Sequence, residues 1–155
     1  MICADDNQTS TVQKEAKSIA LCGRKKKACI VLAEDDYEMR TLLAVTLVKA
    51  GYKVVECPDG WRLLEHLEGH ILLDSEAEKI DLIISDIRMP GITGIEILRG
   101  LPQRSGYPPV ILITAFGDKK THCQAEQFGA AAIFDKPFEI DDLLAKVRKI
   151  VPLEN

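Results

Sequence analysis

Residues 81–91 read DLIISDIRMPG, and this stretch decides how the rest of the chain is interpreted. Residues 82–85 form a short run of mostly apolar, β-prone side chains, which is typical of a parallel strand buried on both faces. The run ends in Asp86 and is followed by the turn residues 89–91 (MPG), so Asp86 should stand where the chain leaves the carboxyl end of a strand. Ligands bind at that edge of open α/β sheets, although a single aspartate there can equally cap the next helix.

The composition describes an ordinary globular chain of 155 residues, with 46% hydrophobic and 28% charged side chains. No apolar run approaches the roughly 18 residues of a membrane span, and no export signal precedes the first apolar run, so we expect a cytoplasmic protein without a membrane partner. The five cysteines are scattered and form no CxxC pair, which indicates reduced thiols. The net charge of −4 combines a basic segment 1–27 with an acidic remainder, which argues against direct nucleic-acid binding.

Apolar strand patterns alternate with helical periodicity five times from residue 28 onward. We expect strands at 28–33, 53–57, 82–85, 110–114 and 131–134, each followed by a helix. With right-handed crossovers this order predicts an α/β fold, a doubly wound parallel sheet in one domain. Residues 1–27 are polar and are interpreted as a flexible extension, with a short helix expected around residues 13–21.

Chemically capable side chains follow four of the five expected strands: Glu34, Asp35, Asp86, Thr114 and Lys136. If the strands are parallel, these side chains meet at one edge of the sheet. Three neighbouring carboxylates would repel one another, and Mg²⁺, which prefers oxygen ligands, would relieve that repulsion. A lysine and a hydroxyl opposite a metal-bound carboxylate can hold the oxygens of a phosphoryl group, which makes Asp86 the candidate acceptor.

Each residue also has a simpler interpretation. Lys136 alone could form a surface salt bridge, and Thr114 alone could be a helix cap or a β-branched strand residue. Taken singly, these simpler interpretations are the more common ones. Taken together, they require several coincidences of strand position, so the joint pattern favours a site.

Four motifs with this spacing resemble the receiver domain of two-component response regulators: EDD at 34–36, SDIRMPG at 85–91, TA at 114–115 and KPF at 136–138. The resemblance covers about residues 28–151, between the extension 1–27 and a tail at 152–155. It implies a flavodoxin-like (βα)5 fold with strand order 2-1-3-4-5 and a stand-alone receiver. It also implies phosphotransfer to an aspartate from a phosphohistidine on a histidine kinase or a histidine phosphotransfer protein.

The resemblance assigns roles residue by residue. For Mg²⁺ it implies Asp35, Asp86 and the backbone carbonyl of Arg88, with Glu34 acting mostly through a metal-bound water. For the phosphoryl oxygens it implies Thr114 and Lys136, with Asp86 as the acceptor. Asp36 is expected to cap the following helix instead of binding metal.

The resemblance also implies a switch, in which Thr114 moves inward when the phosphoryl group arrives. Ala115 matches the small residue of the family after the threonine. At the position where the family often has a mobile aromatic, this chain has Ile133, so packing of Ile133 is expected to transmit the change. The helix at 118–128 has a thin apolar stripe, chiefly Cys123 and Phe128, and should move most easily.

Three functions compete for this pattern. The first is a phosphoacceptor switch that signals to a downstream protein target, with a possible homodimer through the last helix-strand-helix face. The second is a phosphatase of the haloacid dehalogenase type, which requires an aspartate two residues after the nucleophile, where this chain has Arg88. The third is an inert binding module, against which the intact site residues argue. We therefore expect no enzymatic turnover, and we expect Arg88 and Phe116 to flank the phosphoryl pocket and slow its hydrolysis.

Overall fold

The structure is a computed structural model, and it describes residues 25–73, 79–101 and 106–154. The strands are β1 (Cys29–Ala33), β2 (Lys53–Cys57), β3 (Leu82–Asp86), β4 (Val110–Thr114) and β5 (Ala132–Asp135). The helices are α2 (Tyr37–Lys49), α3 (Gly60–Leu73), α4 (Gly94–Gly100), α5 (Lys119–Gln127) and α6 (Ile140–Ile150). The short helix expected around residues 13–21 lies outside the described residues. None of the described helices combines the length and the apolar character needed to cross a bilayer.

The five strands form one parallel sheet in the order β2-β1-β3-β4-β5. This confirms the flavodoxin-like topology that the sequence predicts. The register pairs Ala33 with both Cys57 and Ser85, and Thr114 with Asp135. Because the strands are parallel and in step, their carboxyl ends share one edge of the sheet.

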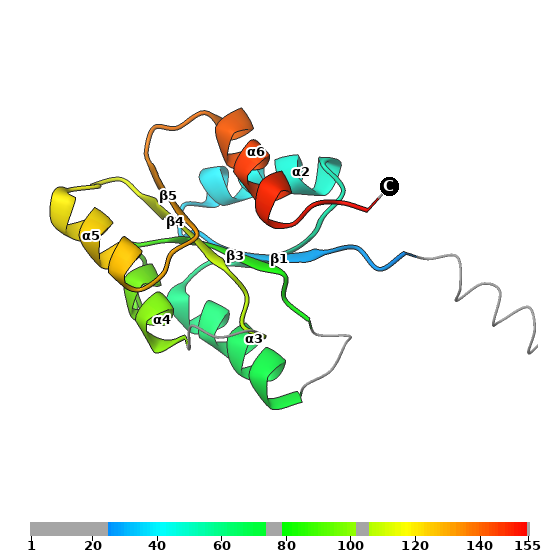
Figure 1. Cartoon of the computed structure of the whole chain (residues 1–155), viewed down its shortest axis with the longest axis horizontal. Helices are drawn as coiled ribbons and strands as arrows, with labels where there is room; N and C mark the ends of the chain where they lie inside the picture. The colour runs from blue at the N-terminus through cyan, green and yellow to red at the C-terminus, as the bar shows by residue number, and fades with distance from the viewer. Residues whose placement is uncertain (1–24, 74–78, 102–105, 155) are drawn as a thin grey trace, which may run out of the picture.

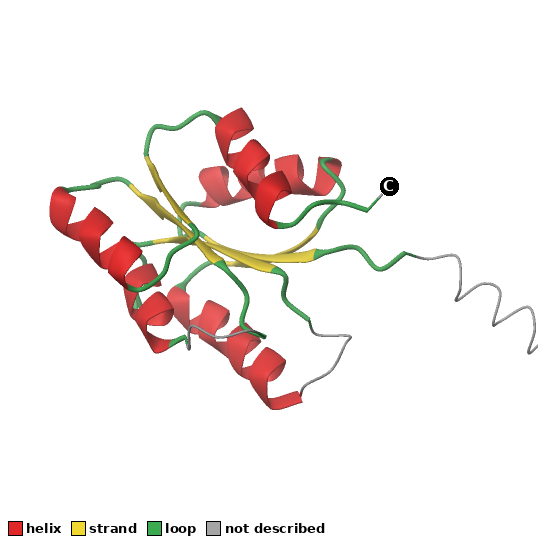
Figure 2. Cartoon of the chain, viewed as in Figure 1, coloured by secondary structure: helices red, strands yellow, loops and turns green. Residues whose placement is uncertain are grey.

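Helices cover both faces of the sheet, α2 and α6 on one side and α3, α4 and α5 on the other (Figures 1 and 2). Successive side chains of a strand point to opposite faces, so each strand contributes to two cores. Every residue of β3 and of β4 is buried. Leu82, Ile84, Ile111 and Ile113 pack with α2 and α6, and Ile83 and Leu112 pack on the opposite face. This double burial explains why both strands are mostly apolar along their length instead of alternating between apolar and polar residues.

Helix caps fix where α2 and α4 begin beside the strand ends. Asp36 accepts a hydrogen bond from the Met39 amide at 2.7 Å, which confirms its predicted role as the cap of α2. Thr93 and Glu96 form a capping box at the start of α4. Both helices therefore start close to the carboxylates at the ends of β1 and β3.

Among the described helices, which begin at the carboxyl edge of the sheet, α5 has the fewest buried residues. Ala125 is its one buried residue within Lys119–Gln127. The expected contribution of Cys123 to the apolar stripe is wrong, because Cys123 is exposed, while Phe128 packs against the core from the end of the helix. Few buried contacts give a helix a low cost of local displacement.

Candidate functional site

Asp86 is the last residue of the central strand β3 and is only 4% exposed. Its Oδ2 accepts a hydrogen bond from Lys136 Nζ at 2.7 Å, and its Oδ1 accepts one from the Arg88 amide at 2.9 Å. Thus one oxygen is held by a cation and the other by the backbone of the next turn. The alternative in which Asp86 caps the following helix is wrong, because Thr93 is the cap of α4.

Glu34 follows β1 and is buried beside Asp86, with 1% of its surface exposed. Its Oε2 accepts a hydrogen bond from Lys136 Nζ at 3.0 Å, and its Oε1 accepts one from the Asp36 amide at 3.1 Å. Arg40 Nη1 donates to the backbone carbonyl of Glu34 at 2.8 Å, which fixes the loop after β1. The ammonium group of Lys136 therefore bridges the carboxylates of Glu34 and Asp86.

The charges of Glu34, Asp86 and Lys136 together favour the binding of further positive charge. Burial, assisted by the nearby Asp86 carboxylate, raises the pKa of Glu34 to about 7 against the opposing hydrogen bonds from Lys136 and Asp36. For Lys136, burial alone would lower the pKa, but the hydrogen bonds and charges of Asp86 and Glu34 outweigh it and raise the pKa. One lysine thus stays charged without fully compensating the two buried carboxylates.

Asp35 completes an acidic cluster with Glu34 and Asp86. Each of the three offers a carboxylate oxygen, and these oxygens lie within 4.8 Å of one another. Asp35 is exposed and Glu34 and Asp86 are buried, so the cluster opens to solvent on one side. Three hard oxygen donors, of which only Glu34 and Asp86 are shown to pair with Lys136, fit a divalent cation such as Mg²⁺. The backbone carbonyl of Arg88 as a further ligand, and the water-mediated role of Glu34, stay predictions.

Thr114 ends β4, the strand next to β3, and is 1% exposed. Its Oγ1 accepts a hydrogen bond from the Phe116 amide at 3.1 Å, so the hydroxyl is held by the loop that follows the strand. The Lys136 amide donates to the Thr114 carbonyl at 2.7 Å. The loops after β4 and β5 are thereby joined at the edge where Asp86 stands.

The geometry agrees with the comparisons with known proteins. Residues 30–148 match the response regulator receiver domain. The chain belongs to the receiver domain family. Sporulation initiation phosphotransferase F of Bacillus subtilis is 31% identical over 126 residues, which cover 81% of this chain and 95% of that protein. The C4-dicarboxylate transport transcriptional regulatory protein DctD of Pseudomonas aeruginosa is 39% identical over 123 residues, but these cover only 24% of its length.

Solved structures share the receiver fold. A CheY-like receiver domain protein of Methanospirillum hungatei superposes with a TM-score of 0.70 at 22% identity, covering 80% of this chain and 93% of that one. The chemotaxis response regulator CheY4 of Vibrio cholerae superposes with a TM-score of 0.66 at 25% identity, covering 81% of this chain and all of that one. At 22% identity, the likeness to the Methanospirillum hungatei protein is evidence of a shared fold alone.

In this receiver the expected switch residue Ile133 and its neighbour Phe134 on β5 face different cores. Ile133 packs against the cluster that includes Ala125 of α5, whereas Phe134 packs on the α2 and α6 side. The Phe134 ring lies 5.6 Å from the ring of Phe138. Ile133, and not the neighbouring aromatic residue, therefore packs on the face of the sheet that α5 covers, and its role in a switch stays a prediction. Ala115 is exposed in the loop after Thr114, and its role stays a prediction.

Sequence reasoning also missed a contact between α5 and the end of β5 in the receiver. His122 Nε2 of α5 lies 3.0 Å from both carboxylate oxygens of Asp135, the last residue of β5. Gly117 lies beneath this pair, because an added Cβ would overlap Asp135 Oδ1. The pair therefore links α5 to the residue before Lys136, and neither residue stands in a motif that would have indicated it.

Proposed function

We propose that this receiver is a phosphoacceptor switch in which Asp86 takes a phosphoryl group from a phosphohistidine. The observation that carries the proposal is the placement of a buried strand-end carboxylate within 2.7 Å of Lys136 and inside an acidic cluster. Sporulation initiation phosphotransferase F, a relative of which this chain covers 95%, is named as a phosphotransferase. The donor would be a histidine kinase or a histidine phosphotransfer protein, and the setting would be cytoplasmic.

The reaction requires a nucleophile and two groups that stabilise charge on the transferring phosphoryl. One carboxylate oxygen of Asp86 attacks phosphorus, the bond from phosphorus to the imidazole nitrogen breaks, and the imidazole leaves with the electron pair and takes up a proton. Mg²⁺ held by Asp35, Asp86 and the Arg88 carbonyl, with Glu34 behind a bound water, would supply positive charge at the acidic cluster. Lys136 would hold one phosphoryl oxygen, and the Thr114 hydroxyl would donate to another.

The output would be a change of shape, not repeated turnover. Inward movement of Thr114 would pull the loop that its hydroxyl and carbonyl already join to Phe116 and Lys136. Ile133 would follow, and α5, with its single buried residue in Lys119–Gln127, would be the least costly element to shift. A downstream protein, or a second copy through the α5-β5-α6 face, would recognise the new surface.

Intact-mass measurement tests the acceptor directly. After incubation with Mg²⁺ and phosphoramidate, we expect one added phosphoryl group, which Asp86→Asn abolishes. Asp36→Asn is the matched control, because it removes a carboxylate at the same edge while asparagine preserves the cap of α2. An unmodified wild-type chain, or an adduct that survives Asp86→Asn, would contradict the proposal. Continuous release of phosphate from simple esters would instead support a phosphatase.

A further inference from the structure

Cations gather at the end of the molecule opposite the acidic cluster. In a parallel sheet with helical crossovers, strand starts and helix ends share this amino end. The exposed basic residues there are Lys25, Lys26, Lys27, Lys49, Lys53, Lys79, Arg99, Arg148 and Lys149. Among the described residues, the acidic side chains at this end are only Asp81, Glu126 and Glu154. Among the residues that the structure describes, this end of a chain with net charge −4 is therefore basic.

Helix electrostatics explain part of this pattern. Lys49, Arg99, Arg148 and Lys149 lie in the last turns of their helices, where a cation stabilises the negative end of the helix dipole. The remaining lysines precede or begin strands: the run 25–27 leads into β1, Lys53 begins β2, and Lys79 leads into β3. These lysines do not lie at helix ends, and Lys79 is paired with Asp81.

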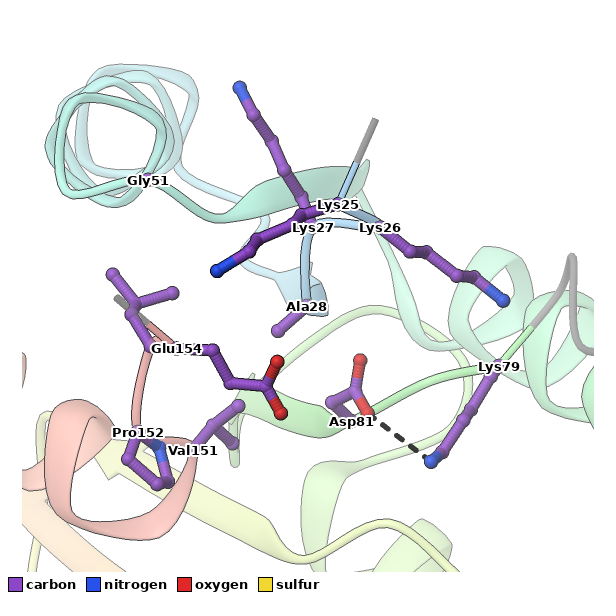
Figure 3. Close-up of a pocket in the computed structure, with 11 residues that line it drawn as sticks. Lys25, Lys26, Lys27, Ala28, Gly51, Lys79, Asp81, Val151, Pro152 and Glu154 are labelled. Carbon is purple, nitrogen blue, oxygen red and sulfur yellow. Dashed lines mark ion pairs between the residues drawn. The ribbon is translucent and has the colours of Figure 1, made fainter. Parts of the chain in front are cut away.

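The lysine run borders a cavity of about 510 Å³ at this end (Figure 3). The side chains of Lys25, Lys26 and Lys27 point in different directions in Figure 3 and do not converge on one point. Lys79 is directed to Asp81, with its Nζ 3.9 Å from Oδ1. Divergent lysines suit an extended anionic surface better than a single small anion.

Acidic and apolar side chains lie beside these cations, and Asp81 and Glu154 line the cavity with them (Figure 3). Val151, Pro152 and Leu153 line the same cavity, and Leu153 is 38% exposed. The tail is held in place, because the Tyr52 hydroxyl donates to the Val151 carbonyl at 2.8 Å. A surface that combines basic and exposed apolar side chains is typical of proteins that rest on anionic lipid.

We propose that the amino end of this receiver docks on the surface of an anionic phospholipid bilayer. Lysines near such a surface each add to binding, and exposed Leu153 can contact the interface. Nucleic acid is a poorer partner, because single-stranded bases stack on exposed aromatic side chains. The exposed aromatic residues of the described chain lie at the opposite edge, away from the lysine run: Tyr37, Trp61 and Phe116. The helices also point their carboxyl termini toward this end, so none of the described helices presents its side to the major groove of DNA.

This docking would orient the molecule. The acidic cluster lies at the far ends of the strands, and an anionic surface repels it, so the edge that carries Asp86 would face away from the lipid. A phosphohistidine partner would then approach from the side away from the lipid. The inference does not depend on the phosphoacceptor function, because it rests on charges at the opposite end.

Co-sedimentation of the full chain with vesicles tests the proposal. We expect binding to equimolar phosphatidylcholine and phosphatidylglycerol, and none to phosphatidylcholine alone. The variant Lys25→Glu/Lys26→Glu/Lys27→Glu should bind at least about 100-fold more weakly. The matched control Lys119→Glu/Lys120→Glu changes adjacent exposed lysines at the opposite edge and should bind as the wild type does. Salt at about 0.5 M should release the wild type, since it shortens the range of surface electrostatics to a few Å.

Several results would overturn this inference: no binding to the anionic vesicles, equal loss of binding in both variants, or tighter binding to a DNA duplex than to the vesicles. Phosphorylation of the lysine variants by phosphoramidate, read by intact mass, is a separate measurement. A chain that binds vesicles and is never phosphorylated would leave this inference standing and refute the proposed function.

Discussion

The guanidinium carbon of Arg88 lies 4.4 Å from the centre of the Phe116 ring, in a cation–π contact between the loops that follow β3 and β4. Arg88 is anchored by its amide to Asp86 Oδ1, and the Phe116 amide is anchored to the Thr114 hydroxyl. The pair therefore connects the loop of the candidate acceptor to the loop of the candidate switch residue. The two residues that are expected to flank the pocket thus contact each other, and their effect on the phosphoryl group stays a prediction.

From this contact we predict a slow loss of the phosphoryl group. The double variant Arg88→Asn/Phe116→Gly should lose the aspartyl phosphate roughly threefold to tenfold faster, because water gains access and an exposed cation–π contact is lost. The rate is measured by intact mass after the donor is removed. Arg62→Asn, which removes an exposed arginine on α3, should leave the rate unchanged. An unaltered lifetime in the double variant would eliminate the idea.

Lys136→Met should be costly in two ways. It leaves Glu34 and Asp86 buried without their shared cation, which should lower the free energy of unfolding in the presence of a chelator by about 2–4 kcal/mol. It should also slow phosphorylation by phosphoramidate at least about 100-fold, because a preorganised charge is lost. Urea unfolding measures the first effect and time-resolved intact mass the second.

A double-mutant cycle separates these effects. Adding Glu34→Gln to Lys136→Met removes one unpaired carboxylate and should restore part of the stability, while phosphorylation should stay slow. If both variants were equally unstable, repulsion between Glu34 and Asp86 could not be the cause of the loss.

Much of this fold could be predicted because its local signals agree. The buried runs of β3 and β4, the terminating glycine after α2 and the threonine cap of α4 each indicate the element that forms there. Convergence of Asp35, Asp86 and Glu34 followed from parallel topology alone, since strand ends share an edge. The positions of these residues in the sequence were therefore enough to predict the acidic cluster.

Contacts that depend on side-chain direction could not be predicted. Nothing local indicates that Lys136 contacts Glu34 as well as Asp86, or that His122 reaches across to Asp135. Cys123 was expected in the core because it fits the apolar periodicity of α5, but Ala125 is the buried residue. In a short helix with one buried position, periodicity gives too few points to fix which side faces the sheet.

Glu34 should make the metal-free protein less stable as pH rises. Its pKa is about 7 in the folded chain against 4.5 ordinarily, so the folded state holds a proton that the unfolded state releases. The stability that this proton provides is full below about pH 4.5 and is lost as pH rises through about 7, with a limit of about 3 kcal/mol. Urea unfolding with a chelator between pH 4.5 and 8 measures the loss.

Glu34→Gln isolates this contribution, because glutamine does not titrate. The difference in unfolding free energy between wild type and variant should change across this pH range, and a constant difference would contradict the assignment. Mg²⁺ affinity should increase through pH 7 in the wild type, because the proton on Glu34 opposes binding of a cation. In Glu34→Gln that pH dependence should be reduced.

The contact between His122 and Asp135 should hold α5 in place. Because Ala125 is the one buried residue of Lys119–Gln127, His122→Ala should let α5 open more readily, by up to about 1 kcal/mol for a half-exposed pair. Hydrogen exchange of the α5 amides measures the change. His66→Ala on α3 is the control and should leave α5 exchange unaltered.

Gly117→Ala should also let α5 open more readily, by a different change. The added Cβ would overlap Asp135 Oδ1 and crowd His122 Nε2, so the pair must separate even though both partners remain. We expect α5 exchange to rise as it does in His122→Ala, with no further increase when the two substitutions are combined, because both remove one contact. Additive effects would show that Gly117 holds α5 by a separate route and that the contact between His122 and Asp135 is not the connection between them.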